Sequence, residues 1–523
     1  MCMEVQNYGD CNSCHKPVPA RTVTREGQVY LTKSCKDCGE TETLISSDAA
    51  RYFRKRSLDR PYDYRGCSFE CLSCKHPKQP QTIFLDVTNR CNLNCPICIA
   101  NVSAMGFRYE PPMEYFEKIF SHFGQMNPRP SVQLFGGEPT VREDLIDIIN
   151  LAWSHDVRPR VVTNGLRLAD EEYCRELLST GVRILFSYDG AEMETYRRLR
   201  NKSKALPLKL KALENIRKYA KTKITIMYVV AEGMNENELD SLFQFLHERR
   251  DFISAVDFIP IAPTWVPGRF AGLESKRVTI EDVEGFVDRA FPNEPMEFLP
   301  AGVLDVDFFT EYFKLRRTPF AGVHPNCESV GLLVSNGKEY VPFSHYFKKS
   351  LFDVARHVRQ TEETIVRRLG PITNGWLGTT LKKLGLQRAA SHVVVFAHVG
   401  DVLFRGVRLD RILGTTGFPA VAKALKIVTM IAVGHKTKDV MRAHSQLHTV
   451  LRVIVLPFED DANRESARLE RCAAGFAYVD PELDKVQTIP VCAWGLHKNR
   501  MLAKVTEHYG LRAKGAHKKQ TRL

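Results

Sequence analysis

The chain has 523 residues, of which 44% are hydrophobic, and a formal net charge of +13 at pH 7. This length and composition predict two or three domains with ordinary packed cores. The first residues lack a secretory signal and no apolar run is long enough to span a bilayer, so we expect a soluble, cytoplasmic protein. The positive charge suits nucleic acid, an anionic membrane surface or a phosphorylated substrate, and does not choose between them.

Cysteine is used in clusters. Ten of the first eleven cysteines fall in CxxC or CxxxCxxC groups. Such clustering in a chain of this length favours metal ligation in a reducing compartment over a disulfide framework. Two isolated cysteines have no predicted role, Cys2 and Cys174.

Residues 1–60 predict a small metal-binding module. Short strands are expected between two CxxC pairs, with turns at Gly27 and Gly39. Four thiolates at this spacing bind one metal ion tetrahedrally, and a zinc ribbon and a rubredoxin-like iron site share that geometry. The predicted ligands are Cys11, Cys14, Cys35 and Cys38.

A second cysteine group lies in a basic, proline-containing linker over residues 45–80. No strand precedes it, so we predict an auxiliary iron–sulfur cluster whose fourth ligand comes from elsewhere. The three thiols of this group are Cys67, Cys71 and Cys74. The candidate fourth ligands, which could also be plain buried thiols, are Cys327, Cys472 and Cys492.

From residue 82 onward, short apolar runs alternate with helical stretches. This rhythm predicts a parallel α/β domain over residues 61–300, shaped as a partial barrel with its chemistry at the carboxyl ends of the strands. The six expected strands are 82–87, 132–135, 160–163, 184–187, 224–230 and 256–259. Residues 301–523 predict a mixed α+β domain, with a strand at 331–335 and an apolar segment at 391–434 that is either core or an amphipathic lid.

The central motif directly follows the first predicted strand of the barrel. Its CxxxCxxC loop, Cys91, Cys95 and Cys98, can bind three corners of a cubane four-iron cluster and leave the fourth iron open. A zinc site that lacks one ligand is the alternative. The second predicted strand ends in the sequence Phe-Gly-Gly-Glu-Pro-Thr, where paired glycines allow a close backbone approach and Glu138 offers a carboxylate to an ammonium group.

Together the cysteine loop and this glycine motif resemble the radical S-adenosylmethionine (radical SAM) superfamily. The resemblance implies a cluster that chelates SAM, reductive cleavage of SAM to a 5′-deoxyadenosyl radical, and hydrogen abstraction from an unreactive sp3 carbon. It also implies a reducing partner such as ferredoxin or flavodoxin. The implied cofactor contacts are Gly136, Gly137, Glu138, Pro139, Asn164, Ser187, Asp189 and Arg200. Each of the last four could instead be a turn residue or a helix cap.

All the cysteine groups together resemble one branch of the superfamily, the tetraether lipid synthases and the class D radical methyltransferases that act on pterins. This resemblance favours iron in the N-terminal module. The chain departs from the branch at Gln81, where relatives carry a further cysteine, and this departure puts a second auxiliary cluster in doubt.

Three functions follow as hypotheses. The first is carbon–carbon bond formation on a lipid hydrocarbon chain, with peripheral membrane contact through basic residues and part of 391–434 facing the cluster as an apolar groove. The alternative is methylation of a pterin-like heterocycle, which needs a short pocket with hydrogen-bonding groups. A metal-stabilised nucleic-acid-binding protein is the third; it leaves the glycine motif unexplained, so we do not expect nucleic acid as a partner.

Overall fold

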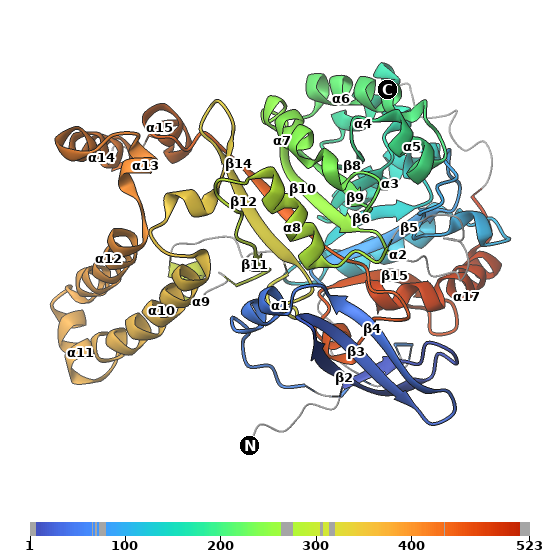
Figure 1. Ribbon diagram of the computed structural model, residues 1–523, viewed down its shortest axis with the longest axis horizontal. Helices are drawn as coiled ribbons and strands as arrows, with labels where there is room; N and C mark the ends of the chain where they lie inside the picture. The colour runs from blue at the N-terminus through green and yellow to red at the C-terminus, as the bar shows by residue number, and fades with distance from the viewer. Residues whose placement is uncertain are drawn as a thin grey trace.

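The computed structural model describes residues 7–64, 66–67, 69, 71–72, 80–262, 276–303, 307–312, 320–432 and 435–512. Two β-sheets organise this part of the chain (Figure 1). One is a four-stranded antiparallel sheet near the N-terminus, and the other is a 12-stranded mixed sheet. A helical arm extends to one side of the large sheet (Figure 1).

The N-terminal sheet is a meander of short strands. Its turns lie where they were predicted, because Gly27 and Gly39 adopt positive φ angles of 76° and 83° between successive strands. The strands are β1 (Asn7–Asp10), β2 (Pro17–Arg25), β3 (Gln28–Cys35) and β4 (Gly39–Ser46). The helix that follows, α1 (Ala49–Arg56), lies in the segment predicted as a linker.

Helix α1 fixes this small sheet to the rest of the molecule. The Asp48 side chain caps the helix by accepting from the backbone N–H of Arg51. Lys55, buried on the opposite side, forms ion pairs of 2.7 and 2.8 Å with Glu281 and Glu284 of α8 (Ile280–Ala290). Because both partners are buried, these pairs set the position of the module against the barrel.

All six predicted barrel strands are present, neighbouring and parallel. Most of their side chains are buried, as expected for a sheet that is covered on both faces. The strands are β5 (Thr82–Thr88), β6 (Ser131–Gly136), β7 (Arg158–Thr163), β8 (Arg183–Ser187), β9 (Ile224–Val230) and β10 (Ile253–Pro260).

Amphipathic helices connect these strands and cover the outer face of the barrel. Helix α2, for example, buries Tyr115, Phe116 and Ile119 against the sheet. The connecting helices are α2 (Met113–Gly124), α3 (Leu145–Ser154), α4 (Glu171–Ser179), α5 (Met193–Arg200), α6 (Ala205–Tyr219) and α7 (Leu239–Glu248). Short 3-10 helices lie at η1 (Val102–Ala104), η2 (Pro139–Val141), η3 (Leu166–Ala169), η4 (Glu236–Glu238) and η5 (Phe343–Tyr346).

The large sheet continues across the boundary predicted at residue 300, and it does so on both edges. On the β10 side, β14 adds in parallel and β12 pairs with it in antiparallel fashion. On the β5 side, β15 adds in parallel and β16 closes the edge. These strands, with two short ones, are β11 (Leu299–Pro300), β12 (Ser329–Ser335), β13 (Tyr340–Pro342), β14 (Thr449–Val455), β15 (Ala474–Asp480) and β16 (Lys485–Pro490).

A buried polar contact ties the C-terminal helix to the first barrel strand. Asp86 of β5 accepts from the Trp494 indole N–H (3.0 Å) and forms an ion pair of 2.9 Å with Lys498. Both partners lie on α17 (Val491–Tyr509). The strand that leads into the cysteine loop is therefore tied to the C-terminal helix.

The helical arm lies between β13 and β14 in the sequence. It has small cores of its own, for example Ile365, Leu369 and Val395 where α10 packs on α12. Its helices are α10 (Leu351–Thr373), α11 (Gly375–Lys383), α12 (Gln387–Gly406), α13 (Leu409–Leu413), α14 (Gly417–Ala432) and α15 (Thr437–His444). Two short helices lie outside this stretch of sequence: α9 (Asp307–Tyr312) packs on α10, and α16 (Ser466–Glu470) packs on β1. Among the described helices, none combines the length and the apolar character needed to cross a bilayer.

Candidate active site

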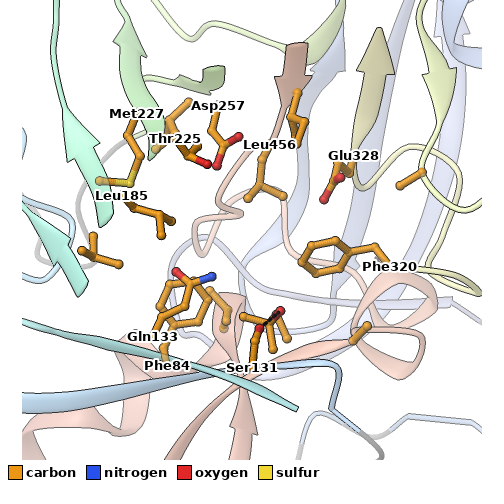
Figure 2. A pocket seen from close by; sticks show the side chains of 18 of the residues that line it. Phe84, Ser131, Gln133, Leu185, Thr225, Met227, Asp257, Phe320, Glu328 and Leu456 are labelled. Atoms are coloured by element: carbon orange, nitrogen blue, oxygen red, sulfur yellow. Dashed lines mark hydrogen bonds between the residues drawn. The ribbon is translucent and has the colours of Figure 1, made fainter. Parts of the chain in front are cut away.

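A cavity of about 2220 Å³ occupies the interior of the barrel. It reaches from the cysteine loop at the carboxyl ends of the strands to side chains near their amino ends. Figure 2 shows part of its wall, where side chains of β5, β6, β8, β9 and β10 face one another. These side chains alternate along each strand, since every second residue of a strand points to the same face.

The cluster loop lies at the mouth of this cavity. The thiols of Cys91, Cys95 and Cys98 line it, and all three are free cysteines. Asn89 holds the start of the loop, accepting from the Tyr109 N–H (2.9 Å) and donating to the Phe107 carbonyl (2.6 Å). The three thiols are thus presented together to the same space, which fits a cluster held by three cysteines.

The glycine pair packs against this loop. A Cβ atom on Gly136 would lie 2.3 Å from the Thr88 carbonyl oxygen, and one on Gly137 would lie 2.1 Å from the Arg90 carbonyl oxygen. The backbone N–H groups of Gly137 and Glu138 donate to these same oxygens, at 2.7 and 2.8 Å. The close approach that requires glycine is therefore an approach of strand end to cysteine loop.

Glu138 is satisfied by the protein itself. Its carboxylate accepts from the Thr140 N–H and hydroxyl (3.1 and 2.7 Å), the Thr163 hydroxyl (2.7 Å) and the Asn164 N–H (2.6 Å). The side chain joins the ends of β6 and β7, and it also lines the cavity. The predicted contact of its carboxylate with a cofactor ammonium stays a prediction beside this structural role.

The other predicted cofactor contacts divide into two sets. Asn164, Ser187 and Arg200 line the cavity with the two glycines, and the Ser187 hydroxyl has no hydrogen-bond partner in the described protein. Pro139 and Asp189 are buried and do not line it. Instead, Asp189 accepts hydrogen bonds of 2.8 and 2.6 Å from the guanidinium group of Arg200, and its predicted contact with the cofactor stays a prediction beside this positioning role.

Arg200 brings a positive charge to the cluster loop. Its guanidinium group lies within hydrogen-bonding reach of the Cys95 thiol. Lys209, which the sequence analysis missed, lies below it on α6, fully buried, and donates to the carbonyls of Asn164 and Ser187 at 2.6 Å each. Burial lowers the pKa of Lys209 to about 8. A lysine on an amphipathic helix gives no signal of this kind in sequence, because most such lysines are solvated.

The four N-terminal cysteines come together as predicted. The sulfur atoms of Cys11, Cys14, Cys35 and Cys38 all lie within 4.8 Å of one another. Hydrogen bonds from the backbone N–H groups of Cys14 and Ser13 lower the pKa of the Cys11 thiol to about 6. Four clustered thiols with such support fit one tetrahedral metal ion.

The second cysteine group is only partly described, because Cys74 lies outside the described residues. Cys67 and Cys71 are buried. The three late cysteines line the cavity and lie close enough together that Cys327 raises the pKa of the Cys472 thiol, in addition to the larger effect of burial. Burial also raises the pKa of the Cys492 thiol, and Cys472 and Cys327 raise it further.

Two acidic residues on the cavity wall were not anticipated. Oδ1 of Asp257 on β10 and Oε2 of Glu328, just before β12, have no hydrogen-bond partner among the described residues. Figure 2 shows both carboxylates pointing into the cavity, with Leu456 between them and Phe84 and Gln133 on the opposite wall. Burial raises the pKa of Asp257 to about 6 and that of Glu328 to about 8.

We predicted that part of the apolar segment 391–434 faces the cluster, and this prediction is wrong. None of its described residues lines the cavity. Helix α12 packs on α10 and helix α14 on α13 and α15 instead, within the arm. Hydrophobic content predicted either core or a lid here, but much of the segment is not core, because Val393, Phe396, Phe418, Val421 and Leu425 are exposed.

A partial parallel barrel with a three-cysteine loop at the end of its first strand and a Gly-Gly-Glu turn at the end of its second defines a radical SAM enzyme. Residues 85–246 match the Radical SAM superfamily model, so this part of the chain is a radical SAM domain. Residues 9–47 match the model described as the HMPTM N-terminal zinc ribbon domain. The N-terminal module is therefore of the zinc-ribbon type.

Among curated proteins, the chain is 26% identical over 516 residues to the 7,8-dihydro-6-hydroxymethylpterin dimethyltransferase of Methanocaldococcus jannaschii, covering 95% of both chains. It is also 26% identical to the Fe-coproporphyrin III synthase of Methanosarcina barkeri, over 52% of this chain and 63% of that protein. A GTP 3′,8-cyclase of Alkaliphilus metalliredigens is 24% identical over 50% of this chain and 90% of its own. The first of these similarities extends over the N-terminal module, the barrel and the C-terminal part together.

Proposed function

We propose that this radical SAM enzyme is a methyltransferase that transfers carbon from a methyl or methylene donor to a pterin-like heterocycle, the alternative raised above. The observation that carries the proposal is the pair of unpartnered carboxylates, Asp257 and Glu328, on the cavity wall. Carboxylates accept from adjacent ring N–H and amino groups, which a hydrocarbon chain does not have. Similarity to the pterin dimethyltransferase over 95% of both chains supports the same substrate class.

The opposite wall suits a flat ring. Phe84 and Phe135 line the cavity with their ring centroids 5.7 Å apart in an edge-to-face arrangement. Gln133 lies two residues before Phe135 on the same face of β6 and offers both a donor and an acceptor. An aromatic heterocycle placed here would stack on phenylalanine while its polar edge faces the carboxylates.

When bound, a four-iron cluster and SAM supply a 5′-deoxyadenosyl radical, which removes a hydrogen atom from an unreactive carbon. Cys91, Cys95 and Cys98 would hold the cluster. Ser187 and Asn164 would contact the cofactor, while the Asp189–Arg200 pair keeps a positive charge beside Cys95. The barrel's own contribution is to orient the heterocycle toward that end and to exclude water. An electron donor such as ferredoxin or flavodoxin stays a prediction.

An auxiliary cluster belongs to the same proposal. Cys67 and Cys71 lie near the late cysteines, since the Cys67 N–H donates to Glu470 (3.1 Å), two residues before Cys472. Thiols on this side of the cavity would hold the cluster close to the substrate. For the N-terminal module, we propose one bound ion, zinc or iron, on its four cysteines.

The lipid hypothesis remains as the second candidate because of one observation. Beyond β12, the cavity has an apolar wall contributed by η5 and α10. Its side chains include Phe343, Phe347, Leu351, Val354 and Val358. An alkyl chain could lie along this wall, but it offers no hydrogen-bond donor to the carboxylates on the barrel wall.

The test compares substrates under reducing, anaerobic conditions. Reconstituted enzyme and SAM are incubated separately with 7,8-dihydro-6-hydroxymethylpterin and with long-chain diether and diester lipids, and 5′-deoxyadenosine is measured. We expect stimulation by the pterin. Above pH 8, where both carboxyl groups are ionised, kcat/KM should be at least about tenfold lower in Asp257→Asn and Glu328→Gln because the donor edge of the ring loses a charged acceptor.

Matched controls are Asp240→Asn on α7 and Glu363→Gln on α10, which remove the same charges at exposed positions outside the cavity. Both should behave like the unmodified enzyme. Stimulation by a lipid and by no pterin would overturn the proposal and leave the radical SAM assignment intact.

A further inference from the structure

The arginines that line the cavity fall into two groups. Three of them are paired with acids, namely Arg200 with Asp189 (2.6 Å), Arg468 with Glu459 (2.8 Å) and Arg129 with Asp156 (3.6 Å). The remaining four form no ion pair and no side-chain hydrogen bond with any described residue. They are Arg158, Arg160, Arg183 and Arg452.

These four arginines, the arginine set, lie toward the amino ends of the strands. Arg160 of β7 is directly opposite Arg183 of β8 in the parallel register. Arg158 is two residues earlier on the same face of β7, and Arg452 projects from β14. Like charges that face each other across neighbouring strands are destabilising, so this arrangement has an electrostatic cost in the absence of a partner.

The repulsion reaches across the cavity. Burial lowers the pKa of Arg160, and both Arg183 and Arg452 lower it further. Asp257 acts in the opposite direction on Arg160 but forms no ion pair with it. Positive side chains from β7, β8 and β14 therefore act on one another across the cavity, and none of them forms an ion pair with Asp257 or Glu328.

Guanidinium groups are well suited to one kind of ligand. Their planar fork donates two parallel hydrogen bonds to a phosphate or a carboxylate, and several forks around one space bind such an anion strongly. A cavity with surplus positive charge also raises the local concentration of anionic substrates. Neither property serves a neutral hydroxymethyl group or a hydrocarbon chain.

We infer that the arginine set binds an anionic group, a phosphate or a carboxylate, carried by the substrate on the side remote from the reacting carbon. The inference rests on the proposed function for the rest of the substrate, a heterocycle whose polar edge meets Asp257 and Glu328. Cys91, Cys95 and Cys98 lie at the carboxyl ends of the strands, so the reacting carbon points there and the anionic substituent points toward the amino ends.

Three reduced pterins test the inference on the reconstituted holoenzyme: 6-hydroxymethylpterin, its phosphate monoester and 6-carboxypterin. We expect the KM for SAM cleavage to be at least about tenfold lower with one or both anionic compounds than with the neutral one, the equivalent of one charge-assisted hydrogen bond. A preference between the two anionic pterins identifies the group as phosphate or carboxylate.

Arg160→Gln and Arg183→Gln should raise the KM of the preferred anionic pterin about tenfold and leave that of the neutral pterin unchanged. Arg183 is exposed to the cavity, so its replacement requires no repacking if Arg160→Gln fails to fold. The matched control is Arg500→Gln, which removes the same charge from an exposed position on α17 outside the cavity.

Equal KM values for all three pterins, in the unmodified enzyme and in both variants, would overturn the inference and leave the proposed function standing. If no pterin stimulates SAM cleavage, the proposed function fails and inorganic phosphate and pyrophosphate decide the inference separately. An anion that raises the thermal midpoint of the unmodified holoenzyme, but not of Arg183→Gln, supports the arginine set as an anion site. The same rise in both proteins, or none in either, overturns it.

Discussion

The two ends of the cavity differ in whether their charged side chains are paired with other groups of the protein. At the cluster end, Glu138 accepts four hydrogen bonds and Asp189 holds Arg200. At the amino end, Asp257 and the arginine set have no partner within the described protein. Asp257 and Arg160 are half-buried, so leaving them unpaired has a free-energy cost, whereas the other three arginines of the set are exposed. Charged groups that are paired within the protein suit a scaffold for a resident cofactor, and unpaired charged groups suit the binding of an exchangeable ligand.

Replacing the three cysteines of the central loop tests the first half of this comparison and should have the largest effect. In the triple variant Cys91→Ala, Cys95→Ala and Cys98→Ala, we expect about four fewer irons per chain, as for one cubane cluster. Reductive cleavage of SAM should be lost with them. Iron analysis and 5′-deoxyadenosine formation with dithionite measure the two effects. Product formation at the parental rate would contradict the assignment.

The N-terminal module extends the comparison, since it too needs a resident group. Its own buried cluster contains only Cys11, Val18 and Cys35, which is too small to stabilise a fold alone. We expect Cys35→Ser to lose about one metal ion per chain and to lower the thermal midpoint, because the free energy of metal binding is part of the folding free energy. Metal analysis also separates zinc from iron. The irons of the central cluster should be retained.

Much of this frame was predictable from the sequence. Six alternating strands, two turns and the four-cysteine module were predicted because hydrophobic period, glycine and cysteine spacing are local signals. The continuation of the sheet on both edges was not, because β12, β14 and β15 are distant in sequence from the strands they extend. Pairing between remote strands depends on the completed fold.

The candidate site shows the same division. Cysteines and glycines identify themselves by spacing, whereas Asp257, Arg160 and Arg183 are single charges within apolar strands. Their signal was weak but present: a charge in a buried strand, at a position whose period-2 neighbours face inward. For Asp189 the pairing with Arg200 was not predictable, because sequence cannot distinguish a residue that contacts a ligand from one that holds its neighbour.

Asp189→Asn tests the paired end and should have an intermediate effect. Asp189 is fully buried and Arg200 is 14% exposed, so the substitution leaves a buried cation without its acid. We expect the free energy of unfolding to fall by about 3 kcal/mol, as for other broken buried pairs. Denaturant unfolding measures it. The control is Glu194→Gln, whose exposed pair with Arg197 should contribute less than about 1 kcal/mol. Equal effects would contradict the distinction.

Asp257→Asn tests the open end, where the expected effect on stability is smallest and has the opposite sign. Burial raises the pKa of Asp257 from 3.8 to about 6, and the facing charges of Arg160 and Arg452 do not restore it. Between these two pH values the unfolded chain releases its proton first, so stability falls as pH rises, and the full cost is present above pH 6.

The asparagine variant avoids this cost. At pH 7.5 we expect it to be more stable by about 1–2 kcal/mol, after allowance for water in the cavity, and the gain should be smaller at pH 5.5. The same variant should bind the heterocycle less well, as argued above, so that stability and function change in opposite directions. Thermal midpoints at the two pH values, with Asp240→Asn as the exposed control, measure the gain. If the variant is less stable at pH 7.5, the Asp257 carboxylate stabilises the fold. It would then not be an unpaired group that is available for a ligand.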